Sequence, residues 1–382
     1  MYKFVSGMIK LALLGFLLLL LYFHDRLKIE FTYPFHTIFD NIYIRIAKIC
    51  VILLMVYEVM RIFYYTIIKN PKAPKWLGSV ATLAMPVVLL LAALEIAFMF
   101  VAQSHEGGLT LASHVWFARY WKPVNSQGYR DVEHTDTLGK KKVIVIGDSF
   151  AAGHGVDNAD DRFSNVLAQK LGEEKYAVYN LGISGSDTRD EYERFEKAGV
   201  RPDVLILQYF PNDIEKAARQ HGLVPAAFQP YSDLSKPLRL LVSRSYFLNY
   251  LYWQLPHGDF KPFDQYANRV YTDTTILNTH LQDLKKFVDY KNQHGATMYV
   301  VLFPFAFQLE KTKEYMRPIM AFFKENNIPV LEVGNLIGDL EPARRIVGRN
   351  DAHASAEVNQ RVGAALYDLV ASGEKNKLTL AR

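Results

Sequence analysis

Three apolar segments near the N-terminus constrain this chain more than any other feature of its sequence. They cover about residues 8–23, 46–67 and 79–103. A helix that crosses the ~30 Å hydrocarbon core of a bilayer needs about 20 apolar residues, which the second and third segments have and the first nearly has. Because residues 22–25 offer no small-residue cleavage site, we expect an uncleaved anchor and not a signal peptide. The sequence therefore predicts a membrane region at residues 1–103 with three transmembrane helices.

The basic residues between these segments predict the orientation of the chain. Lys69, Lys72 and Lys75 follow the second segment with no acid among them, whereas basic and acidic residues are mixed after the first segment. Lys and Arg concentrate on the cytoplasmic side of a membrane, so we place the N-terminus and the 69–75 loop inside. We expect a multi-pass protein of the inner (plasma) membrane, with residues 104–382 on the extracytoplasmic (periplasmic) side and the lipid bilayer as a partner.

Two carboxylates lie within the predicted spans, where an unpaired charge is costly. Glu58 and Arg61 are spaced three residues apart and can pair on one helix face. Glu95 has no evident partner in its own segment. It is either protonated or turned toward the helix bundle, or it contacts a partner membrane protein.

Composition excludes several other classes of function. The net charge of +5 comes without a block of like charges, so we expect no nucleic-acid partner. Cys50 is the single cysteine, which rules out an internal disulfide and a cysteine metal site. The sequence has no dinucleotide fingerprint, phosphate loop or His-x-x-x-His pair, so we expect no cofactor and no metal.

From residue 140 onward, short apolar runs alternate with amphipathic stretches. The runs are residues 143–146, 177–181, 204–208, 298–303 and 330–333, and the amphipathic stretches are residues 163–171, 189–198, 277–292, 315–326 and 356–370. Nearly continuous apolar runs are typical of strands buried on both faces of a parallel sheet. The sequence therefore predicts an α/β domain over residues 104–382, with a three-layer, doubly wound parallel sheet.

An aromatic-rich insertion at about residues 214–271 is too long for a simple crossover. Long insertions of this kind often serve as lids or binding surfaces. Tyr250 and Trp253 are its candidate substrate-binding residues. The alternative is a satellite packing element that contacts no ligand.

Four polar blocks follow the predicted strands or lie beside their ends. They are Gly147-Asp148-Ser149-Phe150, residues 180–186, Phe210-Pro211-Asn212-Asp213 and residues 350–355. The carboxyl ends of parallel strands meet at one edge of a sheet, so we expect these blocks to lie close together. At that edge Ser149 begins a helix whose N-terminus can favour developing negative charge.

These blocks resemble those of the SGNH (GDSL) hydrolases, which have a flavodoxin-like sheet. The resemblance covers about residues 125–372, and residues 125–130 and 153–156 are similar to the membrane-anchored bacterial branch of that family. It implies that Ser149 is the nucleophile and His353 the base, with Asp351 completing the triad. It also implies an oxyanion hole formed by Ser149, Gly185 and Asn212.

Each role in this set has a physical reason. A serine hydroxyl needs a base to take its proton, an imidazole titrates near neutrality, and a carboxylate fixes its tautomer. Two backbone N–H groups and the Asn212 amide can stabilise an oxyanion, and glycine at position 185 lets the backbone approach closely. Asp351 has an alternative role, as the cap of the final helix.

Two positions depart from the family pattern. Phe210 stands where the third block has glycine, and it narrows the predicted pocket. Asn350 stands three residues before His353, where the family has its aspartate, and Asp351 stands two before it; Asn350 is the fallback as orienting group. Phe210 and His154 join the candidate substrate-binding residues as parts of the pocket wall.

The expected function is a membrane-anchored serine esterase that cleaves O-acyl esters on an extracytoplasmic glycan or lipid through an acyl-serine. One alternative is an O-acyltransferase that passes the acyl group to a sugar hydroxyl and works with a polytopic membrane acyl-donor protein. The other is a non-catalytic scaffold with the same fold, which the intact serine, glycine, asparagine and histidine disfavour.

Overall fold

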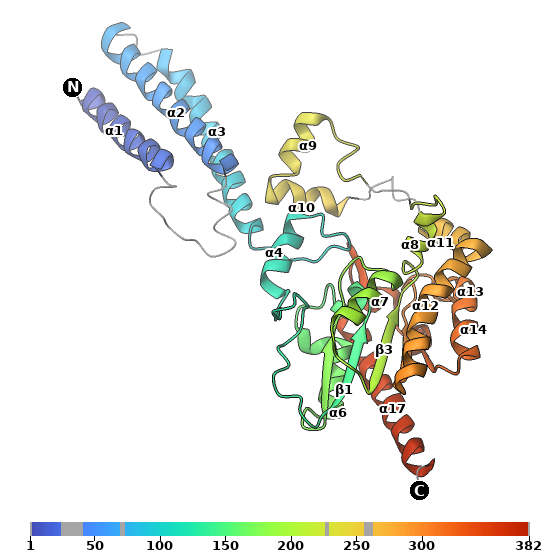
Figure 1. Ribbon diagram of the computed structural model, residues 1–382. Helices are drawn as coiled ribbons and strands as arrows, with labels where there is room; N and C mark the ends of the chain where they lie inside the picture. The colour runs from blue at the N-terminus through green and yellow to red at the C-terminus, as the bar shows by residue number, and fades with distance from the viewer. Residues whose placement is uncertain (1, 24–40, 69–72, 226–228, 256–262, 381–382) are drawn as a thin grey trace. The chain divides into compact units, whose positions relative to one another are not determined.

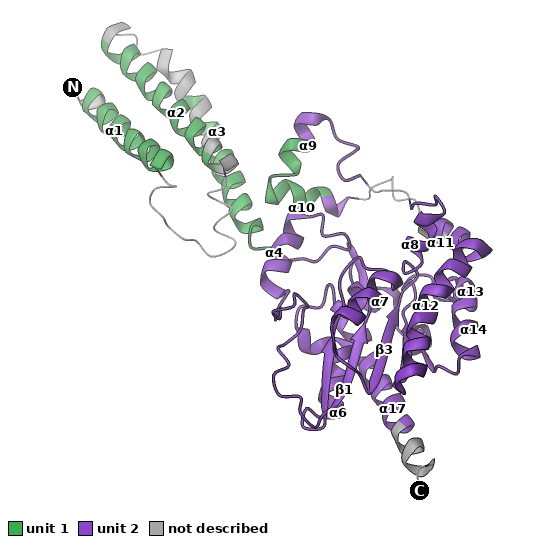
Figure 2. Cartoon of the chain, viewed as in Figure 1, with its two compact units in different colours: residues 1–101, 240–252 green, residues 102–239, 253–382 purple. Residues whose placement is uncertain are grey.

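The computed structural model describes residues 2–23, 41–68, 73–225, 229–255 and 263–380. These residues form two compact units (Figure 2). The first contains residues 1–101 and 240–252, and the second contains residues 102–239 and 253–382. The predicted boundary after residue 103 lies two positions from this division. A short piece of the insertion, however, belongs with the N-terminal unit.

A five-stranded sheet forms the centre of the second unit. Its strands are β1 (Lys141–Ile146), β2 (Tyr176–Asn180), β3 (Val204–Tyr209), β4 (Thr297–Leu302) and β5 (Val330–Glu332). All neighbouring strands pair in parallel, in the order β2-β1-β3-β4-β5. This order reverses direction between β1 and β3, the position where α/β proteins of this class form their sites.

Alternate residues of the strands enter two separate cores. Ile144 and Leu205 belong to one core, and Val143 and Val204 belong to the other, because successive side chains point to opposite faces of a strand. Helices cover both faces of the sheet (Figure 1). The parallel α/β fold predicted from the sequence is confirmed, and its layers are helix, sheet and helix.

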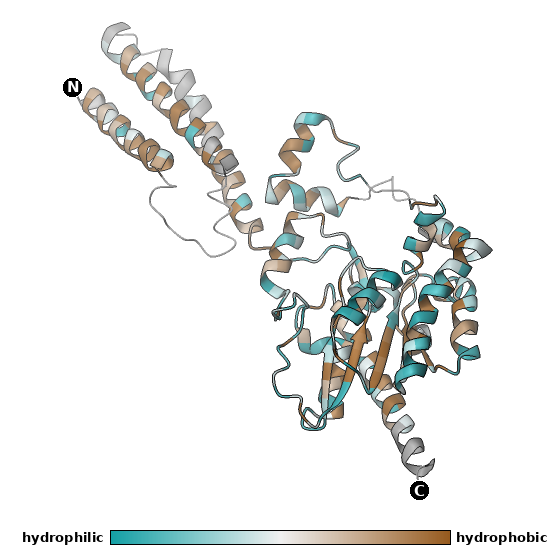
Figure 3. Cartoon of the chain, viewed as in Figure 1, coloured by the Kyte–Doolittle hydropathy of each residue, from teal (hydrophilic) through white to brown (hydrophobic). Residues whose placement is uncertain are grey.

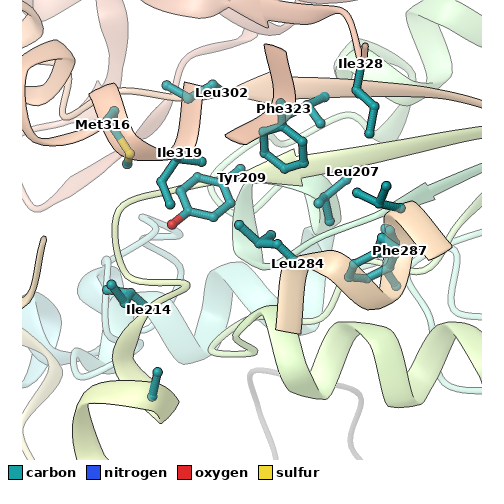
Figure 4. Packing of buried hydrophobic residues seen from close by; sticks show 14 of the residues in the cluster. Leu207, Tyr209, Ile214, Leu284, Phe287, Leu302, Met316, Ile319, Phe323 and Ile328 are labelled. Carbon is teal, nitrogen blue, oxygen red and sulfur yellow. The ribbon is translucent and has the colours of Figure 1, made fainter. Parts of the chain in front are cut away.

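Each core is completed by a different set of helices. The first is packed by α7 (Thr188–Lys197), α8 (Glu215–Gln220), α11 (Phe263–Thr272), α12 (Thr274–His294) and α14 (Arg317–Glu325). The second is packed by α5 (Ser149–Ala152), α6 (Phe163–Leu171), α15 (Val333–Ile337) and α17 (Ala356–Leu380). In Figure 4, Leu284 and Phe287 of α12 lie near Leu207 of β3, with Phe323 beside them.

Two features of this unit differ from the sequence prediction. The helix expected at residues 315–326 is α14, which begins at Arg317, and a separate helix that was not predicted, α13 (Leu309–Tyr315), precedes it; Pro318 in the first turn of α14 has no N–H to continue the preceding helix. The polar block around His353, for which no strand was predicted, is part of an antiparallel hairpin of β6 (Ile346–Gly348) and β7 (Asp351–Ala354). The remaining elements of this unit are α4 (Leu111–Tyr120), α16 (Pro342–Arg345) and the 3₁₀-helix η4 (Ala159–Asp161).

The first unit has helices at the three predicted membrane positions. They are α1 (Tyr2–Phe23), α2 (Asn41–Phe63), which continues as the π-helix η3 (Tyr64–Ile68), and α3 (Ala73–Phe98). Among the described residues, one helix, Phe4–Phe23, is long and apolar enough to cross a membrane, and Pro86–Phe98 is a shorter apolar helix. The prediction of three spanning helices is thus supported only for the first. In α2, Lys48, Glu58 and Arg61 interrupt the apolar character, and in α3 the apolar helix found is the shorter Pro86–Phe98. In Figure 3 most of α1 has the brown colours of hydrophobic residues.

Ion pairs compensate the charge of one of the two carboxylates in the membrane region. Glu58 lies 2.7 Å from Arg61 on the same helix, as the spacing predicted, and 3.5 Å from Lys10 of α1. Residues 69–72, which carry two of the three lysines that predict the orientation, lie outside the described residues.

The insertion at residues 214–271 is helical where it is described. It contains α8, α9 (Lys236–Val242), α10 (Tyr246–Gln254) and α11. Residues 226–228 and 256–262 lie outside the described part.

Candidate active site

Ser149, His353 and Asp351 form a continuous chain of hydrogen bonds at the carboxyl edge of the sheet. The Ser149 Oγ lies 2.7 Å from His353 Nε2, and His353 Nδ1 lies 2.6 Å from Asp351 Oδ1. All three side chains are buried. Since Nδ1–H donates to the carboxylate, Nε2 carries the lone pair that accepts the serine proton.

Asp351 and His353 are both on strand β7, and this explains their two-residue spacing. Residues i and i+2 of a strand point to the same side, so the carboxylate meets the imidazole without a bent loop. The Asp351 Oδ1 also accepts the His353 backbone N–H at 3.1 Å. At the start of α17 it is the Ser355 Oγ that accepts a backbone N–H, from Val358. Asn350 takes no part in the triad, since its amide donates to the Trp253 carbonyl.

Opposing effects set the pKa values of the pair. Burial alone raises the pKa of Asp351, but the hydrogen bond from His353 and its charge outweigh burial and lower the pKa to about 2. Burial alone lowers the pKa of His353, yet the hydrogen bond and charge of Asp351 raise that pKa above its usual value. The pair therefore favours the protonated form of His353.

A tight turn between β1 and α5 presents the serine. Asp148 caps α5 by accepting the Phe150 N–H at 2.8 Å. Gln208 Oε1 on β3 accepts the Asp148 N–H at 2.9 Å and the Ala151 N–H at 3.1 Å. A Cβ at Gly147 would collide with the Gln208 side chain, so only glycine fits there. The helix expected to favour negative charge has four residues, so its macrodipole is small and local N–H groups take that role.

The predicted oxyanion residues border the same cavity as Ser149. Gly185 and Asn212 follow β2 and β3, and both line the cavity beside the serine and His353. Gly185 has φ +78°, and a Cβ there would meet nothing within 4 Å. The left-handed conformation therefore gives a reason for glycine at this position, and its close approach to an oxyanion stays a prediction.

Five phenylalanines line this cavity, whose volume is about 470 Å³. They are Phe117, Phe150, Phe210, Phe305 and Phe307. Phe210 stacks on Phe150 with 4.3 Å between ring centroids, so the residue that replaces the family glycine does line the cavity. The wall favours an apolar acyl chain or a sugar face over a highly charged group.

His154 lies directly against the base. Its ring is stacked on His353 at 4.4 Å, with Trp116 stacked at 5.6 Å. Its Nε2 donates to the His105 carbonyl at 3.0 Å, because a carbonyl can only accept. Burial, then the charge of His353, lowers the pKa of His154 to about 4. His154 is therefore neutral at pH 7 and supports the plane of the catalytic ring.

The two predicted aromatic contacts of the insertion lie elsewhere. Trp253 is not among the residues that line the cavity; its ring packs edge-on against His105 at 4.6 Å. Tyr250 packs against Phe98 in the first unit. Their roles in substrate binding stay predictions.

Several residues that shape the site carried no strong sequence signal. Arg130 donates to the carbonyls of Gly153, Val156 and Tyr120 at 2.5–2.8 Å and holds the loop after α5. Glu106 lines the cavity, and burial raises its pKa, with His353 opposing the rise. The Glu106 carboxyl is accessible from the cavity, but the protein around it removes part of its contact with water. The signal that could have identified Gln208 is a polar residue near the end of an otherwise apolar strand.

Three carboxyl groups are buried beneath the oxyanion residues. Asp148, Glu191 and Asp213 are each at most 1% exposed. Burial raises the pKa of each, and their mutual repulsion raises those of Glu191 and Asp213 further. Burial and mutual repulsion therefore both favour the protonated form of these carboxyl groups.

Among the described residues, one group has the side chains to hold a metal ion. It is His154, Asp351 and His353, whose candidate ligand atoms lie within 4.8 Å of one another. Both nitrogen atoms of His353 and Nε2 of His154 serve the hydrogen bonds described above, so this group fits a proton-transfer site better than a metal site.

Comparisons with known proteins agree with this geometry. A model of the GDSL-like lipase/acylhydrolase family matches residues 145–376. No curated protein matches this chain.

Solved structures of similar proteins include three enzymes at low identity. They are a lipase/acylhydrolase from Enterococcus faecalis (12% identity, 60% of this chain and 95% of that chain, TM-score 0.38), a psychrotrophic esterase from Pseudoalteromonas sp. (11%, 62% and 100%, 0.38) and an acetylxylan esterase from Geobacillus stearothermophilus (14%, 60% and 94%, 0.36). At this level of similarity they carry no argument about the substrate.

The opposing effects on the triad give a pH prediction. Wild-type kcat/KM should fall as pH drops through the raised pKa of His353, since the base must be neutral. In Asp351→Asn, burial then dominates, so the acid limb should shift to lower pH while kcat falls by up to ~10⁴. The measurement is kcat/KM for p-nitrophenyl acetate against pH, with the exposed Asp289→Asn as control. An acid limb that stays in place in Asp351→Asn would contradict the pairing.

Proposed function

Because this chain belongs to the GDSL-like lipase/acylhydrolase family, we propose that it hydrolyses O-acyl esters through an acyl-serine formed on Ser149. The observation that carries the proposal is the Ser149–His353–Asp351 chain of hydrogen bonds on the cavity wall. A serine that served only to form the turn would need neither an imidazole nitrogen 2.7 Å from its Oγ nor a buried carboxylate bonded to that imidazole.

The first half-reaction forms the acyl-enzyme. Ser149 Oγ attacks the ester carbonyl carbon as its proton moves to His353 Nε2, and the carbonyl oxygen becomes an oxyanion. The N–H groups of Ser149 and Gly185 and the Asn212 amide donate to that oxyanion. Collapse breaks the bond to the leaving alkoxide, which takes the proton from Nε2.

The second half-reaction regenerates the enzyme. A water molecule gives a proton to Nε2 and attacks the acyl carbonyl, and Ser149 Oγ leaves with that proton. Asp351 stays ionised throughout and stabilises the imidazolium in both halves. A sugar hydroxyl can take the place of water, in which case the product is an acylated sugar.

We propose that the chain is held at a membrane by its N-terminal helices, with the acylhydrolase unit on the extracytoplasmic side. Support comes from the apolar helix Phe4–Phe23 and from the lysines at residues 69–75. The substrate class that fits this position is an O-acylated glycan or lipid. A membrane acyl-donor protein as partner would convert the same site to acyl transfer.

Catalysis should depend on the serine and histidine as one unit. Ser149→Ala should abolish p-nitrophenyl acetate hydrolysis, and adding His353→Ala should cost little more, because triad members act together. Exposed Ser372→Ala is the control. Near-native turnover in either single variant would contradict the proposed mechanism. If the wild-type enzyme forms an acylated sugar from an added glycan, acyl transfer is favoured over hydrolysis.

The orientation can be measured with reporter fusions. An enzyme that is active only outside the cytoplasm should report when it is fused after Arg382 and stay silent when fused near Lys72. A cytoplasmic reporter should give the opposite pattern. If the Arg382 fusion reports from the cytoplasm, the proposed extracytoplasmic substrates are excluded.

A further inference from the structure

The segment from α9 to the end of α10 combines exposed leucines with positive charge. Residues 234–258 contain no Asp or Glu but do contain Lys236, Arg239 and Arg244, all of them exposed. The exposed leucines are Leu238, Leu240, Leu241, Leu251 and Leu255, at 45%, 51%, 52%, 44% and 63%. A run of apolar side chains with cations interspersed is typical of surfaces that meet anionic lipid.

Glu95 of α3 ties this segment to the N-terminal helices. Its Oε2 accepts the Ser245 hydroxyl at 2.7 Å and the Phe247 N–H at 3.1 Å, and its Oε1 accepts the Tyr246 N–H at 2.7 Å. These donors are the unpaired groups at the N-terminus of α10, which favour a negative charge. The carboxylate that had no partner in its own helix thus has one in a distant segment of the same chain.

Packing reinforces this contact. The Phe98 ring at the end of α3 lies 5.2 Å from Phe247 and 4.9 Å from Tyr250. The Asn249 amide donates to the Val242 carbonyl and joins α10 to the end of α9. Residues 240–252 accordingly form one compact unit with residues 1–101 (Figure 2).

The lengths of the two helices decide how they can meet a bilayer. The seven residues of α9 and nine of α10 rise about 10 Å and about 14 Å, far less than the ~30 Å hydrocarbon core. They cannot span a membrane but can lie along its surface. Glu95 is in the last turn of α3, where this apolar helix leaves the membrane in the proposed attachment. The exposed side chains of Leu91, Ile96 and Phe100 form an apolar surface at the same end of α3.

We propose that residues 236–255 form an interfacial segment that lies in the headgroup layer of an anionic bilayer, fixed to α3 by Glu95. The inference rests on the proposed membrane attachment and adds a second contact with lipid beyond the apolar helix Phe4–Phe23. The chain leaves this segment at Trp253, whose carbonyl accepts the Asn350 amide at 3.1 Å next to the triad strand.

The depth of Leu241 tests the proposal. The full chain with Cys50→Ser and Leu241→Cys is labelled with an environment-sensitive fluorophore and reconstituted into phosphatidylcholine vesicles with and without phosphatidylglycerol. We expect a blue-shifted emission that spin-labelled acyl chains quench. The same label at Leu138→Cys, a 96% exposed position of the second unit, should stay water-like. Water-like emission at 241 in both vesicles would overturn the proposal and leave a protein as the partner of the leucines.

One further label, an assay and a charge variant separate this inference from the proposed function. A label at Leu17→Cys in α1 reports attachment alone: quenching at 17 without quenching at 241 would reject the interfacial segment and keep the anchor. Hydrolysis of p-nitrophenyl acetate by the same samples reports the active site, which contains none of these positions. Lys236→Gln with Arg239→Gln should remove the difference between the two vesicle compositions, and an unchanged difference would contradict the role of charge.

The Glu95 contact has its own test. In Glu95→Gln the amide protons of Tyr246 and Phe247 should exchange about five-fold faster, as expected when a helix loses a charged cap. Glu58→Gln is the matched control, since Glu58 is also an acid of the membrane region but pairs with Arg61. Equal exchange in Glu95→Gln and wild type would show that Glu95 does not hold α10.

Discussion

The parallel direction of the five strands is the constraint on which the site depends. Each strand ends at the same edge, so three polar turns that are far apart in sequence meet after β1, β2 and β3. The reversal of strand order between β1 and β3 opens space there, and Gln208 of β3 accepts two N–H groups from the Ser149 turn. The base arrives from a separate hairpin, in which the alternation of β7 places Asp351 and His353 on the same side.

Burial and hydrogen bonding together set the pKa values of the histidines near the serine. Burial keeps His154 neutral, with a pKa of about 4, while the partnership with Asp351 overcomes burial for His353 and raises its pKa. The pKa values of the two stacked imidazoles therefore shift in opposite directions, and the one that a carboxylate supports is the one bonded to Ser149. Burial and mutual repulsion raise the pKa values of Glu191 and Asp213, which favours their protonated forms.

The apolar strands and the four polar blocks made the sheet and the triad predictable. Val143 to Ile146 are buried on both faces, which is why a continuous apolar run identified that strand. The hairpin around His353 was not predicted, because β6 and β7 have three and four residues and no clear alternation. The role of Glu95 could not be predicted either, since its donors lie 150 positions away in the chain. Distant pairing of polar groups leaves no periodic signal in a sequence.

The central claim is that Ser149 is the activated nucleophile of this acylhydrolase. A fluorophosphonate reacts covalently with a serine that a neighbouring base activates, and peptide mass spectrometry locates the adduct. We expect one adduct, on Ser149, that forms rapidly in the full-length protein and is nearly absent in His353→Ala. An adduct on another residue, or equal labelling of Ser149 without His353, would contradict the account.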